Sequence, residues 1–152
     1  TQKELLICIK GSTDILDWGI NVNDSPEPFT FMSGSSGDTP ITGHCHKGML
    51  LGVRAILEDY GVRECVKSLV DRGYIIRVVG HSLGAGICVL LALILRKEIP
   101  DLMPVVYAYA PPPCVSAALA EKCKSELITV KGLISLKSNL LCIANSSIAS
   151  SN

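Results

Sequence analysis

The sequence lacks the features that would indicate a nucleic-acid partner or a membrane span. Lys plus Arg and Asp plus Glu number 14 each, so the 152-residue chain has no formal net charge. Because binding to phosphates depends on a basic surface, this balance argues against nucleic acid. The longest apolar run, Ile87 to Leu95, has 9 residues, far fewer than the roughly 18 that span a bilayer. These absences leave a globular domain with ample material for a core, since 48% of the residues are hydrophobic.

The cysteines also lack a pattern. They are odd in number and irregularly spaced, no Cys-x-x-Cys pair occurs, and several lie inside apolar runs. This usage favours free thiols in a reducing compartment over a disulfide framework, so we expect a cytoplasmic protein. The seven are Cys8, Cys45, Cys65, Cys88, Cys114, Cys123 and Cys142. Because the chain begins with Thr1 and reaches a predicted strand within four residues, it looks like an excerpt from a longer protein.

Hydrophobic periodicity predicts strands that alternate with helices. Leu5 to Ile9, a continuous apolar run, indicates a fully buried strand of the kind that parallel sheets contain. The segment from Asn23 to Thr42 is rich in Pro, Gly and Ser, which predicts a surface loop with one strand at Phe29 to Met32. The other predicted strands are Tyr74–Val79, Val105–Ala110 and Leu127–Val130, and the predicted helices are Met49–Tyr60, Val62–Asp71, Leu83–Lys97 and Ser116–Cys123. The expected class is α/β, a mainly parallel sheet with flanking helices.

One motif carries chemistry. Gly80-His81-Ser82-Leu83-Gly84 fits Gly-x-Ser-x-Gly, with a predicted strand directly before it and a predicted helix directly after it. In this context the serine lies on a sharp, strained turn that exposes its hydroxyl, and side chains on the two glycines would clash across that turn. Ser82 is therefore the predicted nucleophile. The backbone amide of Leu83, at the helix N-terminus, would face the carbonyl oxygen where negative charge develops.

A second loop could complete an oxyanion hole. The strand from Leu5 to Ile9 ends in Lys10-Gly11-Ser12-Thr13. The backbone amide of Ser12 would pair with that of Leu83, because an oxyanion needs two convergent donors.

The chain resembles the class 3 lipases, the group of fungal triacylglycerol lipases and diacylglycerol lipases, over residues 5 to 130. Four blocks carry the resemblance: Cys8-Ile-Lys-Gly-Ser-Thr followed by Trp18, His46-Lys-Gly-Met, Val79-Gly-His-Ser-Leu-Gly-Ala-Gly, and Tyr107-Ala-Tyr-Ala-Pro-Pro-Pro-Cys-Val. The resemblance implies an α/β-hydrolase fold, incomplete here, over residues 1–130, with the remainder, 131–152, as a divergent or poorly ordered tail.

For function, the resemblance implies a serine lipase that needs no metal or organic cofactor. It supports Ser82 as the nucleophile and Ser12 as the oxyanion residue, and it assigns Ile15 to Val22 to the lid region. The fourth block favours the diacylglycerol-lipase-like branch. The expected substrate is an acylglycerol, in particular diacylglycerol, at a peripheral membrane or lipid-droplet surface.

The chain departs from this pattern after the nucleophile. A hydrolase of this fold has its acid and its histidine after the serine, but none of the three histidines follows Ser82, and no carboxylate side chain occurs from Leu127 to the end. Two minor alternatives use residues upstream: His46 as a substitute base, or a zinc site at His44-Cys45-His46. The remaining acidic residues considered, expected to be surface charges, are Glu98, Asp101, Glu121 and Glu126.

Three functions are therefore compatible with the sequence. The first is a lipase whose base and acid come from sequence beyond these residues. The second is a truncated, inactive isoform or fragment that still binds lipid or a partner, because loss of the base leaves the serine without activation. The third is a carboxylesterase of the same fold that acts on small soluble esters.

Overall fold

A parallel sheet organises the chain, as the alternation of strands and helices predicts. The computed structural model describes residues 2–11, 25–32, 40–99, 102–123 and 129–131. The main sheet has four strands in the order β1-β4-β5-β6, and every pair within it is parallel. Its strands are β1 (Glu4–Ile9), β4 (Ile75–His81), β5 (Val105–Tyr109) and β6 (Thr129–Lys131). The expected α/β class with a mainly parallel sheet is confirmed.

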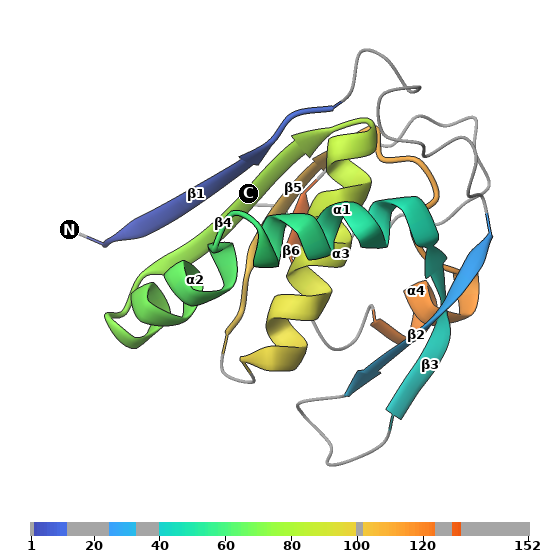
Figure 1. The fold of residues 1–152 in the computed structure, drawn as a ribbon, viewed down its shortest axis with the longest axis horizontal. Helices are drawn as coiled ribbons and strands as arrows, with labels where there is room; N and C mark the ends of the chain where they lie inside the picture. Colours follow the sequence, from blue (N-terminus) through green and yellow to red (C-terminus); the bar gives the residue numbers. More distant parts are fainter. Residues whose placement is uncertain (1, 12–24, 33–39, 100–101, 124–128, 132–152) are drawn as a thin grey trace, which may run out of the picture.

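Three helices lie on one side of this sheet, as Figure 1 shows: α1 (Lys47–Glu58), α2 (Val62–Asp71) and α3 (Leu83–Glu98), with α1 packed on the other two. The central helix is α3, which packs against β4 and β5. It is apolar on almost every side, so most of its residues are buried, and Arg96 and Lys97 occupy its last turn. Alternate residues of the strands point towards it, and Ile76, Val78 and Val106 are fully buried there. The core therefore lies between the sheet and α3.

The segment that the sequence predicts as a loop with one strand is largely a β-hairpin. Strands β2 (Pro26–Met32) and β3 (Pro40–His46) form a separate antiparallel pair. The sequence signal for β3 is weak, because it begins with a proline and contains Gly43 and few β-branched residues. Burial nevertheless alternates along it, with Ile41 and Cys45 facing the core. The loop prediction is wrong for residues 40–42, which belong to β3. The strand predicted at Phe29 to Met32 is too short, because β2 begins at Pro26.

The hairpin is fastened to the segment that follows β5. Cys45 and Val115 form an antiparallel bridge. On either side of it, the amide of His46 donates to the carbonyl of Cys114 at 2.9 Å, and the amide of Ser116 donates to the carbonyl of His44 at 2.8 Å. The short helix α4 (Ala117–Cys123) follows and packs on β3. These contacts hold the hairpin beside the carboxyl end of β5.

Strand β1 differs from the expectation of full burial. It lies at the edge of the described sheet, and only Leu5, Ile7 and Ile9 pack towards the core. Leu6, on the opposite face, is 57% exposed, because the described helices that pack on this sheet lie on the other face. The run is apolar throughout, so hydrophobicity alone could not reveal that one of its faces is open.

The remaining predicted elements agree with the structure to within one or two residues at most ends. The predicted lid at 15–22 lies outside the described residues, and so does the predicted tail, 131–152, apart from Lys131 at the end of β6. Within the described part, no helix has both the length and the apolarity needed to cross a bilayer.

Candidate active site

The carboxyl ends of β1, β4 and β5 meet at one edge of the main sheet. Ile9 at the end of β1 is in register with Gly80, and His81 at the end of β4 is in register with Tyr109 at the end of β5. Loops that follow parallel strands emerge at the same edge, which is where open α/β sheets bind ligands. The Gly-x-Ser-x-Gly turn, the loop after β1 and the loop after β5 are therefore brought together.

Ser82 occupies a strained turn between β4 and α3. Its backbone angles are φ 53° and ψ −124°, in the region of positive φ that residues with a Cβ rarely adopt. Its amide donates to the carbonyl of Tyr109 at 2.9 Å, and its carbonyl accepts from the amide of Ala85 at 2.9 Å. The side chain is exposed and makes no capping hydrogen bond to α3. The backbone of Ser82 is thus held from both sides while its side chain faces solvent.

The two glycines of the motif are required by close packing. A Cβ on Gly80 would lie 2.6 Å from the carbonyl oxygen of Gly84 and 2.7 Å from Sγ of Cys88. A Cβ on Gly84 would lie 2.5 Å from the carbonyl oxygen of Ile9. Real side chains essentially never come so close to backbone atoms, so both positions exclude larger residues. The clash that the sequence predicts across the turn is confirmed, and it involves β1 as well.

The same packing places the loop after β1 against the first turn of α3. The Cβ position of Gly84 is 3.0 Å from the amide nitrogen of Gly11. Leu83, the first residue of α3, has a backbone amide with no acceptor within the helix, because the first amides of any helix lack one. Ser12 lies outside the described residues. The structure therefore brings Ser82, Leu83 and Gly11 together, and the role predicted for Ser12 stays a prediction.

The loop after β5 contributes a feature that the sequence did not single out. Ala110 follows β5 with a φ of 47°, the other positive φ found at a non-glycine residue among those described. This turn lies directly after Tyr109, whose carbonyl anchors the amide of Ser82. The only signal in the sequence is the run of three prolines after Ala110, which shows where the strand stops and not what its last carbonyl binds.

His46 has a structural role. It is the N-cap of α1, and its Nδ1 accepts a hydrogen bond from the amide of Met49 at 3.4 Å. An Nδ1 that accepts a hydrogen bond cannot also carry the proton, so the neutral ring has its proton on Nε2. This bond satisfies one of the free amides at the start of α1. It occupies the nitrogen that would otherwise be available as a base on that side of the ring.

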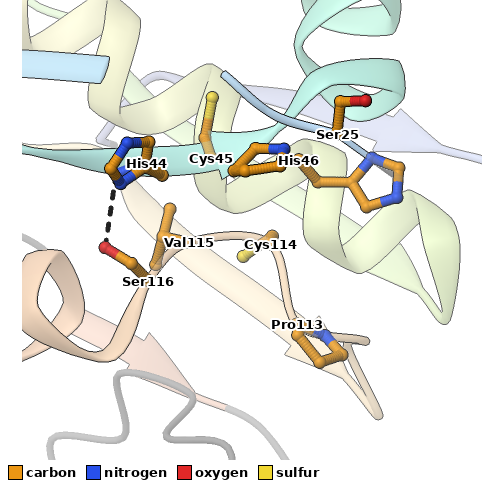
Figure 2. A pocket seen from close by; sticks show the side chains of 9 residues that line it. Ser25, His44, Cys45, His46, Pro113, Cys114, Val115 and Ser116 are labelled. Atoms are coloured by element: carbon orange, nitrogen blue, oxygen red, sulfur yellow. Dashed lines mark hydrogen bonds between the residues drawn. The ribbon is translucent and has the colours of Figure 1, made fainter. Parts of the chain in front are cut away.

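The three-residue sequence His44-Cys45-His46 does not form a compact ligand set. A pocket of about 170 Å³ is lined by this segment and by the chain from Pro113 to Ser116. Figure 2 shows the two imidazoles well apart, with His44 beside Ser116. The amide of His44 donates to Oγ of Ser116 at 3.2 Å. In the part of the chain that the structure describes, no three His, Cys, Asp or Glu side chains are grouped closely enough to hold a metal ion.

Of the acidic residues expected to be surface charges, Glu98 lies far from Ser82. Glu98 ends α3, a helix of 16 residues that begins next to Ser82, so the two are separated by about 24 Å along the helix. Its carboxylate forms an ion pair with Arg63, with Nε to Oε2 at 2.9 Å. Glu121 is an exposed residue of α4. Asp101 and Glu126 lie outside the described residues.

The thiol of Cys88 lies directly beneath the turn at Ser82 but is poorly reactive. It is fully buried in α3, next to Gly80. Burial raises its pKa to about 12, with a smaller contribution from Cys8. A thiol must ionise to act as a nucleophile, so the raised pKa of Cys88 makes this thiol a poor nucleophile.

The chain is similar to diacylglycerol lipases over most of its length. The chain is 29% identical to human diacylglycerol lipase-alpha in an alignment that covers 84% of the chain and 12% of that protein. The rat protein of the same name matches equally well. The chain therefore spans about an eighth of the length of these curated relatives.

Solved structures share the fold. A triacylglycerol lipase from Penicillium expansum superposes with a TM-score of 0.59 at 24% identity, over 84% of this chain and 48% of that chain. A fungal lipase in complex with an inhibitor superposes with a TM-score of 0.65 at 22% identity, over 88% of this chain and 48% of that chain. The expected α/β-hydrolase fold is confirmed, and the described part is a portion of it.

The profile of the family described as lipase (class 3) matches residues 6–136, most of the chain. That match includes the loop after β1, the turn at Ser82 and the end of β5, which together form the edge of the sheet described above. The chain therefore belongs to the class 3 lipase family.

Proposed function

We propose that this chain carries the nucleophile half of a lipase active site and acts on ester bonds of acylglycerols through Ser82. The observation that carries the proposal is the strained backbone of Ser82, at φ 53° and ψ −124°, at the N-terminus of α3. A serine is rarely held in such a conformation unless the surrounding structure imposes it, and strain of this kind clusters at active sites. Membership of the class 3 lipase family supports the same conclusion.

In the proposed reaction, Oγ of Ser82 attacks the ester carbonyl carbon and the carbonyl oxygen becomes an oxyanion. The amides of Leu83 and Ser12 donate hydrogen bonds to it, helped by the positive end of the α3 dipole. The C–O bond to the glycerol moiety then breaks, leaving an acyl-serine that water hydrolyses to a fatty acid. The anchoring of the Ser82 amide on Tyr109 keeps the hydroxyl in position throughout.

The proton of the Ser82 hydroxyl needs an acceptor that these residues do not provide. His44 and His46 belong to β3 and its end, and His46 caps α1. His81 precedes Ser82 directly, and neighbouring residues at a sharp turn point apart. We therefore assign the base and the acid to sequence outside the 152 residues. Without them a serine hydrolase loses about 10⁶-fold in kcat.

The substrate class follows from the relatives. The curated relatives are diacylglycerol lipases and the solved neighbours include a triacylglycerol lipase, so we propose an acylglycerol, in particular diacylglycerol. Tyr109 is 41% exposed beside Ser82 and supplies apolar surface for such a substrate. We further propose that the protein acts in the cytoplasm at a membrane or lipid-droplet surface, where acylglycerols reside.

Substrate preference is tested by fatty-acid release from dispersed diacylglycerol and from a short soluble ester, in the presence of imidazole as an added base. We expect release from diacylglycerol that is lost in the Ser82→Ala variant. Faster turnover of the short ester would favour a small-molecule carboxylesterase of the same fold. Equal release by the wild type and the Ser82→Ala variant would refute the role of Ser82.

A second candidate is a catalytically inactive form that binds lipid or a partner. The observation in its favour is that no histidine follows Ser82 in the sequence. In that case the chain would bind diacylglycerol-containing vesicles in a sedimentation assay, and neither imidazole nor a longer polypeptide would produce hydrolysis that depends on Ser82.

A further inference from the structure

A second hollow lies far from Ser82, at the other end of α3. It has a volume of about 280 Å³ and is bordered by β2, α1, the start of α2 and the last turns of α3. Because α3 begins at Ser82 and has 16 residues, its two ends are about 24 Å apart. The hollow is therefore separate from the candidate active site, and nothing in the proposed reaction uses it.

Apolar side chains form part of the inner surface of this hollow, alongside polar and charged ones. Phe29, Leu50 and Leu57 line it and are buried, and Ile94 lines it and is half-buried. They come from three elements, β2, α1 and α3, so no single element accounts for the surface. A hydrocarbon chain placed on these side chains would exchange water for an apolar contact, which is favourable.

The charged residues at the rim divide into a paired and an unpaired set. Arg63 and Glu98 form two hydrogen bonds, from Nε to Oε2 at 2.9 Å and from Nη2 to Oε1 at 3.1 Å. Both carboxylate oxygens of Glu98 are thus occupied by one guanidinium. Nη1 of the same arginine lies 4.0 Å from Oε1 of Glu58. The acidic side chains of the hollow therefore face Arg63.

Arg54 and Lys97 are the unpaired set. Both line the hollow and both are exposed. Counting only described residues, neither forms an ion pair within 4.0 Å. Lys97 is in the last turn of α3, where a cation also compensates the helix dipole. Arg54 has no such role, because it lies before the last turn of α1. Two cations beside an apolar surface match an amphiphile with an anionic head.

We propose that this hollow binds a medium-chain fatty acid, with its carboxylate between Arg54 and Lys97 and its chain on Phe29, Leu57 and Ile94. The size favours a single chain over a two-chain lipid, since 280 Å³ lies just below the roughly 300–1,000 Å³ typical of small-molecule pockets. A fatty acid is also what ester hydrolysis at Ser82 would release, so a role in product binding rests on the proposed function. The binding site itself does not.

The proposal is tested by titrating the isotopically labelled 152-residue chain with octanoate and following amide NMR shifts. Octan-1-ol and octylammonium serve as probes of the same chain length with a neutral and a cationic head. We expect saturable octanoate binding in roughly the millimolar range, with the largest shifts at Phe29, Leu57 and Ile94. Octylammonium should bind more weakly than octan-1-ol.

Three single-charge variants separate specific recognition from net charge. Arg54→Gln and Lys97→Gln should each weaken octanoate binding by about two- to fivefold, the range of an exposed ion pair. Lys67→Gln removes one charge from α2 outside the hollow and should leave the affinity unchanged. The titration is repeated with Ser82→Ala, which removes the proposed nucleophile and should not alter binding in the hollow.

Three results would overturn the proposal: equal binding of octanoate and octylammonium, equal effects of the three charge variants, or shifts confined to the loops around Ser82. The first two would mean that Arg54 and Lys97 do not recognise a carboxylate. The third would mean that the fatty acid binds only at the active-site edge, which would leave the proposed function intact.

Discussion

Replacing Ser82 by glycine should make the protein more stable than replacing it by alanine. Both substitutions remove the hydroxyl, so the difference between the two variants reports on the backbone alone. At φ 53° and ψ −124°, a residue with a Cβ is strained, whereas glycine adopts positive φ without a steric penalty. The comparison therefore measures the strain that the turn imposes on its central residue.

The expected magnitude follows from two opposing effects. A Cβ in the left-handed region costs about 1–2 kcal/mol, and glycine regains this cost. Glycine also loses about 0.5–1 kcal/mol through the greater conformational freedom of the unfolded chain. The free energy of unfolding of Ser82→Gly should therefore exceed that of Ser82→Ala by about 0.75 kcal/mol, the difference between the midpoints of these two ranges, and by no more than about 1.5 kcal/mol.

Urea unfolding of both variants measures this difference, and Ser68 provides the matched control. Ser68 is an exposed residue in the interior of α2, where Gly should be less stable than Ala by about 1 kcal/mol. The sign of the Gly-minus-Ala difference should thus be opposite at the two serines. If glycine is the less stable substitution at both, Ser82 is not strained and the structural basis for its role as nucleophile fails.

Other predictions concern the packing, the cap and the thiols. Gly84→Ala should lower the free energy of unfolding by about 1–3 kcal/mol, because its Cβ would overlap the carbonyl at the end of β1; wild-type stability in urea would contradict this. His46→Ala should lower the free energy of unfolding by about 0.5–1 kcal/mol, because α1 loses its N-cap. The fluorophosphonate labelling of the folded variant should stay unchanged; a large loss of labelling would instead identify His46 as the base. Iodoacetamide at pH 8 should modify exposed Cys8 much faster than Cys45 and Cys88, as mass spectrometry can show. Burial raises the pKa values of Cys45 and Cys88 from 9.0 to about 11 and about 12. The same thiols ionise at lower pH in the unfolded chain, so the free energy of unfolding should decrease as the pH rises from 9 towards 12. A free energy of unfolding that does not change over this pH range would count against their burial.

Much of the fold and part of the site follow from the sequence, because they depend on local patterns. The apolar run before Gly80 and the long apolar run after Ser82 define β4 and α3, and the motif between them predicts the clash that the structure shows at both glycines. Gly61, which has a φ of 64°, separates α1 from α2; the sequence is compatible with a break here and also with one continuous helix. Each of these features is determined by residues adjacent in the chain.

The features that the sequence did not reveal depend on distant contacts. Strand β3 is a poor strand by composition, and it forms because β2 and the segment at Val115 pair with it. The exposure of Leu6 depends on which face of the sheet the helices cover. The hydrogen bond from Ser82 to Tyr109 depends on the register of β4 and β5. None of these can be inferred from periodicity within one segment.

Covalent labelling of Ser82 by a fluorophosphonate is the most direct test of the central claim. The serine oxygen would attack phosphorus and displace fluoride, while imidazole in the buffer accepts the proton that the missing histidine would take. We expect a single adduct on Ser82 whose rate of formation rises with imidazole concentration and which is absent from the Ser82→Ala variant. Folded protein that forms no adduct even at high imidazole, or that is labelled equally in the Ser82→Ala variant, would contradict the assignment of Ser82 as nucleophile.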